Sequence, residues 1–400
     1  MNIFTRIGNW LGSAAAVMAS EFRAVFHDAG ALLFFVALPL FYPVVYTLIY
    51  NPEVVRQIPV AVVDDSRTAE SRHFVTMASA SPSIKIYDYC SDMGEARELM
   101  AAGDVYGIMY IPRRYASDLA NGVQTNVEFY SDMSLLLRYR TFVAALTDLQ
   151  IKIASEVSGE RLAAAGMESY LTGDSPLPVQ SNSNMLGDVE QGFASFVIPG
   201  IVVLILQQSM LLGIALLGGS RRERRGRALP EPDLADRAGA GARVWGRAMC
   251  YVSIYIAATI YCLHFVPEMF NLPHSGSPVD YLLFIFPELL AAAFLGQALV
   301  GLMKERESCF LILVISSVLF LFLSGLTWPR YAMPDFWLWL SDCIPSTWAI
   351  EGFIRINSNN ATLAENSHPY IMLWILTAVY MIAAIVVTRF VDPRREAVKS

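Results

Sequence analysis

Charged side chains are scarce in this sequence, and several motifs of soluble enzymes are missing from it. Asp, Glu, Lys and Arg make up 16% of the 400 residues, whereas soluble domains usually carry about 25%. The net charge of −7 argues against a nucleic-acid binder, because binding to phosphates needs a basic surface. There is no GxxxxGK(S/T) loop, no GxGxxG loop and no GxSxG elbow, so we expect neither ATP hydrolysis by the usual route nor a nucleophilic serine.

The cysteines and histidines form no recognisable set either. The five histidines are scattered, and none has a cysteine at the spacing of a zinc site, so we expect no metal centre. The five cysteines give no disulfide framework. Cys90 and Cys343 are both predicted to lie outside the membrane, but nothing in the sequence brings them together.

Long apolar runs, in contrast, are abundant. Hydrophobic residues make up 55% of the chain, and the mean hydropathy is +0.43. A helix needs about 20 apolar residues to cross the hydrocarbon core of a membrane. Six segments come close to or exceed that length with at most one acidic residue each: 31–50, 193–217, 249–266, 281–303, 309–327 and 370–388. We therefore predict a polytopic α-helical membrane protein with six transmembrane helices.

The distribution of Lys and Arg between the loops predicts the orientation of the chain. Cytoplasmic loops of membrane proteins carry an excess of these residues. Five of the seven residues from Arg221 to Arg227 are arginine, directly after the second span, and further basic residues follow the fourth and last spans. The short connections on the other side hold only Arg330 and Arg355. Both termini are therefore predicted to lie in the cytoplasm, in a multi-pass protein of the inner (cytoplasmic) membrane.

The predicted domain boundaries follow from these spans. The chain divides into an amphipathic helix at the cytoplasmic interface (1–29), a first transmembrane helix (30–50), an external domain (51–192), five further transmembrane helices (193–391) and a cytoplasmic tail (392–400). The fourth of these segments includes a cytoplasmic loop (218–246) and an outer, re-entrant-like segment (328–356). Apolar residues at three-four spacing in residues 3–26 are typical of a helix lying on the membrane surface.

The external segment has the pattern of an α/β domain. It contains 19 acidic against 11 basic residues, so the negative charge of the protein resides here. Strand-like segments (58–64, 83–89, 105–111 and 125–130) alternate with segments typical of helices (68–80, 92–102, 115–120 and 134–170). Asp64, Asp65 and Asp132 follow strands, and we interpret them as turn and cap residues rather than as a catalytic set.

Four side chains with a carboxyl or amide group lie inside the predicted spans. Burying a carboxylate in a membrane is unfavourable, so Glu288 is a candidate for a functional role. A neutral, hydrogen-bonded acid at the kink of Pro287 is an equally good interpretation. Gln207 and Gln208 in the second span, and Gln297 in the fourth, either line a pathway or connect helices through hydrogen bonds.

Aromatic residues gather before the last span. Residues 328–355 contain four of the seven tryptophans, and aromatic side chains concentrate at membrane interfaces. We predict that this segment, including Trp348, lies on the outer membrane surface or is re-entrant, and does not form another full span. Glu351 and Arg355 are four residues apart and are expected to pair across one helical turn.

The order of these features resembles the permease subunits of type 2 ABC transporters, which have the type V exporter fold. The stretches IPVAVVDDSRTAESR, YGIMYIPRRYASDLANG and VEFYSD resemble that family's external domain. FVIPGIVVLILQQSMLLGIALLGGSRRERRG resembles its second span and following loop, and SGLTWPRYAMP with IPSTWAIEGFIR resembles its outer loop before the last span. The resemblance covers nearly the whole chain. The chain departs from the family after Gly226, where Arg227-Ala228-Leu229-Pro230 replaces the usual Thr or Ser and regular helix.

The resemblance implies a partner and a role for the arginine cluster. In such permeases the loop between spans two and three lies against a separate ABC ATPase subunit, which binds ATP and Mg²⁺, while this chain binds no cofactor itself. The expected contact consists of Arg222, Glu223, Arg224 and Gly226, with the N-terminal helix beside it. Arg221 and Arg227 are expected to act only through their charge, so that lysine would replace them.

The predicted function is therefore that of a permease subunit rather than of an enzyme. It would export an unidentified drug-like, lipidic or other small molecule. Other expected partners are the lipid bilayer and a second copy or paralogue of the permease, with a periplasmic adaptor and an outer-membrane channel as further candidates; nucleic acid is not expected. The alternative is a membrane-anchored receptor or scaffold whose external domain binds a ligand, although an anchor needs neither six spans nor an intramembrane Glu288.

Overall fold

The segment between the first two apolar runs forms a unit of its own. In the computed structural model, which describes residues 3–50, 55–164, 166, 192–226, 238–274, 276–302 and 306–391, Val54–Asn184 is one compact unit, and Met1–Glu53 joins Met185–Ser400 in the other. Each unit has its own hydrophobic core. The predicted tail, 392–400, lies outside the described residues.

The smaller unit is built on a four-stranded sheet with the order β2-β1-β3-β4. β1 (Ile58–Asp64) runs parallel to both of its neighbours, β2 (Ile84–Cys90) and β3 (Gly107–Ile111), while β4 (Glu128–Ser131) is antiparallel to β3. The central strand β1 is almost fully buried, which explains its unbroken apolar run. The four predicted strands are confirmed, with ends that shift by a few residues.

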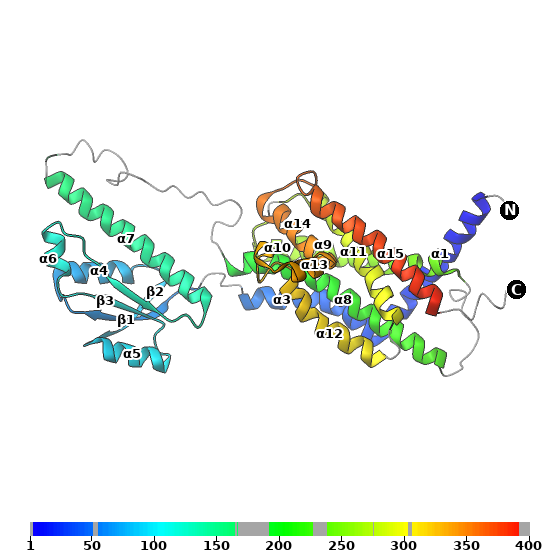
Figure 1. The fold of residues 1–400 in the computed structure, drawn as a ribbon, viewed down its shortest axis with the longest axis horizontal. Helices are drawn as coiled ribbons and strands as arrows, with labels where there is room; N and C mark the ends of the chain where they lie inside the picture. The colour runs from blue at the N-terminus through cyan, green and yellow to red at the C-terminus, as the bar shows by residue number, and fades with distance from the viewer. Residues whose placement is uncertain are drawn as a thin grey trace. The chain divides into compact units, whose positions relative to one another are not determined.

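Helices cover both faces of this sheet (Figure 1). They are α4 (Ala69–Ser79), α5 (Met93–Ala102), α6 (Tyr115–Ala120) and α7 (Leu136–Ala164). Side chains of α4, α6 and α7 form one core with β1, and α5 forms a second core on the opposite face. The predicted α/β pattern of this segment is therefore confirmed.

Asp64 and Asp132 act as turn residues, as expected, whereas the Asp65 carboxylate accepts a hydrogen bond from the Tyr110 hydroxyl at 3.0 Å. The side chain of Asp64 accepts hydrogen bonds from the backbone nitrogens of Ser66 and Arg67, at 3.0 and 2.9 Å. Asp92 caps α5 by accepting from the backbone nitrogen of Glu95 at 2.9 Å. Asp132 accepts from the backbone nitrogen of Ser134 at 2.9 Å.

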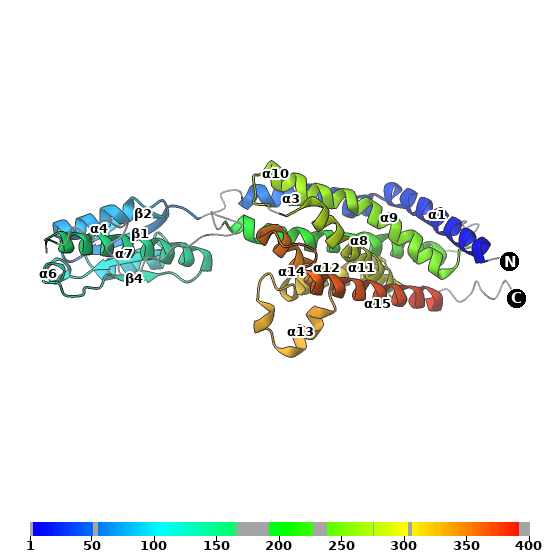
Figure 2. The ribbon, with the colours of Figure 1, turned by 90° about the horizontal axis from the view of Figure 1, so that it is seen from above.

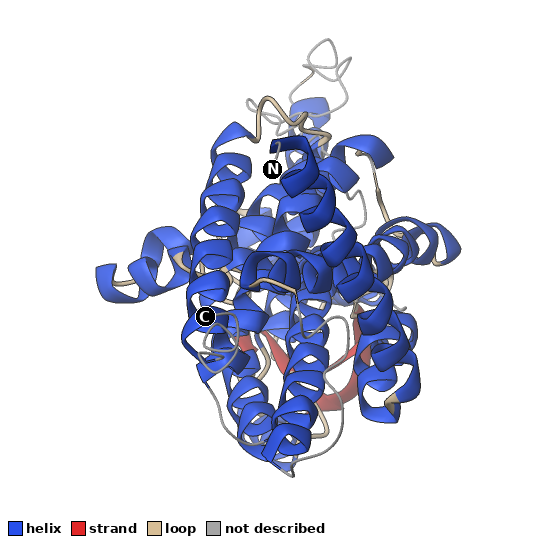
Figure 3. Ribbon diagram, turned by 90° about the vertical axis from the view of Figure 1, so that its right-hand side faces the viewer, coloured by secondary structure: helices blue, strands red, loops and turns tan. Residues whose placement is uncertain are grey.

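The larger unit is a bundle of long apolar helices. Among the described residues, five helices are long and apolar enough to cross a membrane: Ala29–Tyr50, Phe193–Arg221, Ala240–Met269, Pro278–Val300 and Ser367–Phe390. They correspond to five of the six predicted spans. The other prediction, 309–327, coincides with α12 (Arg306–Leu323), whose described apolar stretch is Val314–Leu323. Outside the sheet, the regular structure of the described residues is helical (Figure 3).

Apolar side chains remain exposed on the outer sides of these helices. Examples are Phe41, Leu48 and Ile49 on α3 (Leu38–Tyr50), and Ile315, Val318 and Phe322 on α12. Contiguous apolar surfaces of this kind mark contact with a membrane or a protein partner. Together with the lengths of the helices, they identify a multi-pass membrane protein.

Two helices extend well beyond their apolar runs. α8 (Phe193–Gly226) continues through the arginine cluster, and α9 begins at Ala240, so the described ends of the predicted loop 218–246 are helical. The middle of that loop, 227–237, lies outside the described residues. The prediction erred here because it ended each span where the apolar residues end, whereas arginine is a good helix former that extends a helix into the interface.

Two of the spans are interrupted by π-helical turns. The first consists of α2 (Ala29–Leu32), a π-turn at Leu33–Ala37 and α3. The third consists of α9 (Ala240–Ile260), a π-turn at Tyr261–Phe265 and α10 (Val266–Met269). The fourth and last spans are single helices, α11 (Pro278–Leu302) and α15 (Ser367–Val391).

The N-terminal helix and the outer segment complete this unit. α1 (Ile3–His27) lies along α9 (Figure 2). The outer segment consists of a 3₁₀ turn (Arg330–Ala332), the exposed helix α13 (Asp335–Asp342) and the buried helix α14 (Pro345–Asn359). α13 stands out from the bundle, whereas α14 packs among α8, α11 and α15 (Figure 2). The segment is therefore not confined to a surface.

Candidate functional site

The four carboxyl and amide side chains of the predicted spans are all buried in the helical unit. Gln207 and Gln208 belong to α8, and Glu288 and Gln297 belong to α11, a helix that packs against α8. Gln207 and Glu288 have no exposed surface, and the other two are less than a tenth exposed. None of the four faces lipid.

Two of these side chains connect helices through hydrogen bonds. The Gln207 Oε1 atom accepts from the backbone nitrogen of Ser346 at 2.8 Å, which joins α8 to the start of α14. The Gln297 Nε2 atom donates to the carbonyl oxygens of Ala293 and Val244, at 3.2 and 3.3 Å, which joins α11 to α9. A structural role therefore accounts for Gln207 and Gln297.

The other two side chains lack such bonds. Within the described part of the chain, no hydrogen-bond partner meets either carboxylate oxygen of Glu288 or either side-chain polar atom of Gln208. The hydroxyl of Thr377 on α15 donates instead to the carbonyl oxygen of Pro287, at 2.8 Å. Burying a polar group without a hydrogen bond lowers the stability of the folded protein. A structural role therefore does not account for Glu288 and Gln208.

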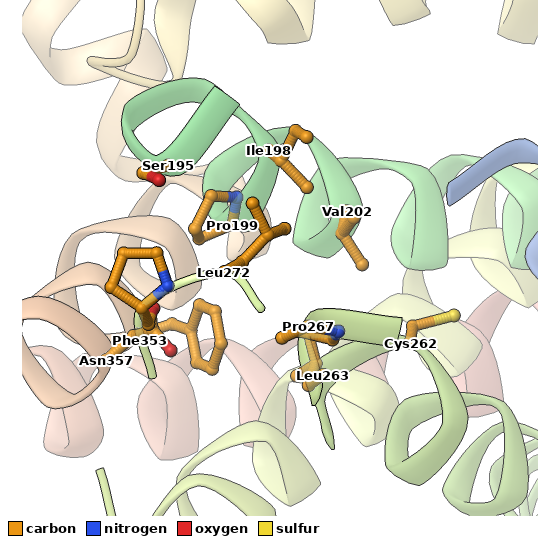
Figure 4. A pocket seen from close by; sticks show the side chains of 11 residues that line it. Ser195, Ile198, Pro199, Val202, Cys262, Leu263, Pro267, Leu272, Phe353 and Asn357 are labelled. Carbon is orange, nitrogen blue, oxygen red and sulfur yellow. The ribbon is translucent and has the colours of Figure 1, made fainter. Parts of the chain in front are cut away.

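A small cavity lies elsewhere in the bundle. It is lined by residues of α8, by the π-turn and α10 of the third span, and by α14, including Ser195, Pro199, Cys262, Pro267 and Phe353 (Figure 4). Its volume of about 10 Å³ suffices for roughly one water molecule. None of the four polar residues lines it, and its volume is far below that of pockets for drug-sized ligands.

The arginine cluster lies on the last turns of α8. The backbone of Arg222, Glu223, Arg224 and Gly226 is helical, and their side chains lie outside the described part of the structure. Arg221, the first arginine of the cluster, is described, and it forms an ion pair with Glu21 of α1. The expectation that lysine would replace Arg221 without effect stays a prediction, and the structure adds that Arg221 has a specific partner on α1.

Glu21 is the centre of a buried ion cluster that the sequence analysis missed. Its side chain is 4% exposed. One carboxylate oxygen accepts from Arg221 of α8 and from the hydroxyl of Tyr251 of α9. The other lies 3.7 Å from the Nε atom of Arg247, also of α9. Burial raises the pKa of Glu21, but the charges of Arg221 and Arg247 outweigh burial and hold the pKa below its usual value.

The sequence does carry a signal for this cluster. Glu21 is the only acidic residue among the first 27, and it lies four residues from both Val17 and Val25, which are buried on the same helix. A lone acid on the apolar side of an amphipathic helix needs a buried partner. The partners could not be named in advance, because Arg221 and Arg247 are some 200 residues away in sequence.

A second ion cluster holds the outer segment together. Arg330 pairs with Asp342 at the end of α13 and with Glu351 of α14, the latter at 2.5 Å. Its guanidinium group also stacks over the Trp348 ring, 4.2 Å from the ring centre. The predicted pair of Glu351 and Arg355 is present at 2.6 Å.

Comparisons with known proteins agree with this architecture. Residues 30–386 match the family described as ABC-2 family transporter protein. The chain is also similar to the linearmycin resistance permease protein LnrN of Bacillus subtilis (strain 168). The two sequences are 20% identical over 364 residues, an alignment that covers 88% of this chain and 92% of that protein.

Proposed function

Because the chain belongs to the ABC-2 family of transporter proteins, we propose that this permease subunit exports a small molecule by using the ATP hydrolysis of a separate ATPase subunit. The family match from the first span to the last carries this proposal. The chain's lack of a phosphate-binding loop agrees with ATP and Mg²⁺ being bound by the partner.

The continuous helix α8 supports coupling to such a partner. It runs without a break from the buried core of the bundle to Gly226. A displacement at the arginine cluster would therefore be transmitted along a rigid element into the membrane-spanning region. We place the ATPase contact at Arg222, Glu223, Arg224 and Gly226.

The packing of the bundle bears on the route of the substrate. The described cavity between α8, α10 and α14 holds about one water molecule, which is too little space for a drug-like or lipidic molecule. A drug-like or lipidic molecule would then pass along a surface shared with a second copy or paralogue of the permease. The related protein from B. subtilis is named for resistance to linearmycin, which agrees with export of a toxic small molecule from the cytoplasm or the inner membrane.

The α/β unit also has a role in the proposed export. It folds separately from the helical bundle, and its chain enters and leaves between the first two spans. We assign it to the external side of the inner membrane, where it would control the exit or bind a periplasmic adaptor that leads to an outer-membrane channel. A receptor would also need such a unit, but it would not need the unsatisfied Glu288.

Reconstitution with the ATPase tests the coupling. We expect the wild-type permease to stimulate ATP hydrolysis by its partner, and the double substitution Glu223→Ala with Gly226→Val to abolish this stimulation, because the charged contact of Glu223 is lost and a branched side chain is added at Gly226. Arg227→Lys is the matched control, since it retains the positive charge that topology requires. Insertion of every variant is checked in parallel. Full stimulation by the double variant would show that the partner docks elsewhere.

A further inference from the structure

The cluster around Glu21 joins three helices at one point. α1 supplies the carboxylate, α8 supplies Arg221, and α9 supplies Arg247 and Tyr251. Arg221 directly precedes the four residues to which we assign the ATPase contact. The cluster therefore lies at the base of the segment that would receive the motion of the partner.

Close packing of the α1 and α9 backbones adds to the contact that Glu21 makes between these helices. Gly246 of α9 faces α1, and a Cβ atom at this glycine would lie 2.5 Å from the carbonyl oxygen of Ala14 and 2.8 Å from the Cβ atom of Val17. Such distances are too short for any side chain, so α1 and α9 approach this closely only because residue 246 is glycine. One turn further along α1 from Val17, Glu21 meets its three partners.

Association of α1 with a membrane surface does not explain this arrangement. An amphipathic helix binds a bilayer through its apolar face and its basic residues, and a buried carboxylate adds nothing to that binding. Desolvating an ion pair is unfavourable, and buried ion pairs are best known for fixing the register of packed elements. The location of Glu21 therefore indicates that α1 is held in one register against α8 and α9.

We propose that Glu21 is a positioning residue for energy coupling, which fixes α1 to α8 and α9 so that the three helices respond to the ATPase as one body. This inference rests on the proposed function. It assigns to α1 a part in transmitting the motion, rather than only in anchoring the chain, and it gives Arg221 a specific partner on α1.

Two chemically unrelated substitutions test whether the contact of α1 with α8 and α9 is needed for coupling. Glu21→Gln removes the charge and keeps the shape, whereas Gly246→Val forces α1 away from α9 and keeps the charges. We expect each to lower the stimulation of ATP hydrolysis roughly five-fold or more, the lower end of typical coupling effects. Gly241→Ala is the matched control on α9, because its Cβ atom finds its nearest neighbour, the Trp10 Nε1 atom, at an ordinary 3.6 Å.

A charge exchange and a distance measurement separate positioning from general stability. Glu21→Arg combined with Arg247→Glu should recover part of the stimulation that Glu21→Arg alone removes. Spin labels at the exposed residues Ala15 of α1 and Ser253 of α9 should keep one distance through the ATPase cycle in the wild type, and a broad distribution in Glu21→Gln. Full stimulation by well-inserted Glu21→Gln and Gly246→Val variants would overturn the positioning role alone. Absence of stimulation by the wild type would overturn the proposed function, and the coupling role with it.

Discussion

At the scale of single residues, Glu288 is the side chain whose position is hardest to reconcile with stability. It is fully buried, and its two oxygens meet no hydrogen-bond partner in the described part of the chain. Leaving a buried polar group unsatisfied typically costs about 1–3 kcal/mol. Sites that carry such a cost are often functional, because proteins violate local rules of stability mainly where function requires it.

Glu288→Met should therefore stabilise the protein and impair transport. We expect its midpoint of thermal unfolding in detergent to equal or exceed that of the wild type, while transport by the reconstituted complex falls. Glu288→Gln should fold normally, because the amide is uncharged and has nearly the same shape as the carboxylic acid. Leu289→Met, at the adjacent buried position, is the control for the change in shape and should alter neither property. A lower midpoint for Glu288→Met would show that the carboxyl group is instead a structural hydrogen-bonding residue.

At the scale of elements, the outer segment shows how a short exposed helix is held in place. α13 leaves several aromatic side chains exposed, among them Phe336, Trp337 and Trp339, so packing alone does not fix it. Arg330 bridges the end of α13 and the middle of α14 and covers the Trp348 ring. This arginine therefore fixes the position of the helix.

Substitution of Arg330 should be much more damaging than substitution of Arg355. The Arg330 side chain is 17% exposed, whereas that of Arg355 is 47% exposed. We expect Arg330→Ala to cost about 1.5–3 kcal/mol, the range for hydrogen bonds to charged groups, and Arg355→Ala about 1 kcal/mol or less. Arg330→Lys should fall between them, because lysine cannot bridge two carboxylates and stack at once. Thermal unfolding and tryptophan fluorescence measure these effects, and equal losses for the two alanine variants would exclude the bridging role.

At the scale of the whole molecule, the orientation in the membrane follows from the basic residues around α8. The arginine cluster ends the second span, and the positive-inside rule predicts that it lies in the cytoplasm. The α/β unit, which precedes that span, is then predicted to be external.

Labelling of single cysteines tests this orientation. In a variant without its native cysteines, Ser131→Cys and Ser275→Cys should react with an impermeant thiol reagent added to the outside of the membrane. Ala228→Cys should react only after the membrane is opened. Strong labelling of Ala228→Cys in intact cells would reverse the predicted topology.

Local patterns predicted most of the secondary structure, because neighbouring residues determine it. The strands of the α/β unit follow from β-branched runs, and the start of α5 follows from Asp92 and the residue three positions after it. Five spans followed from the length of apolar runs. Helix ends were predicted less well. Arg221 and Arg243 lie on helices that extend beyond the apolar residues from which the spans were predicted.

By itself, the sequence determined the class of the protein, the likeness to ABC-2 permeases and the short-range pair of Glu351 and Arg355, since each depends on residues close together in the chain. The tertiary structure alone decided which polar residues meet. Glu21 contacts Arg221 and Tyr251, more than 190 residues away, and Gln207 contacts Ser346, while Glu288 is left without a described partner. The physical reason is that an α-helix specifies which face is polar, but only the packing of helices specifies which two polar faces touch.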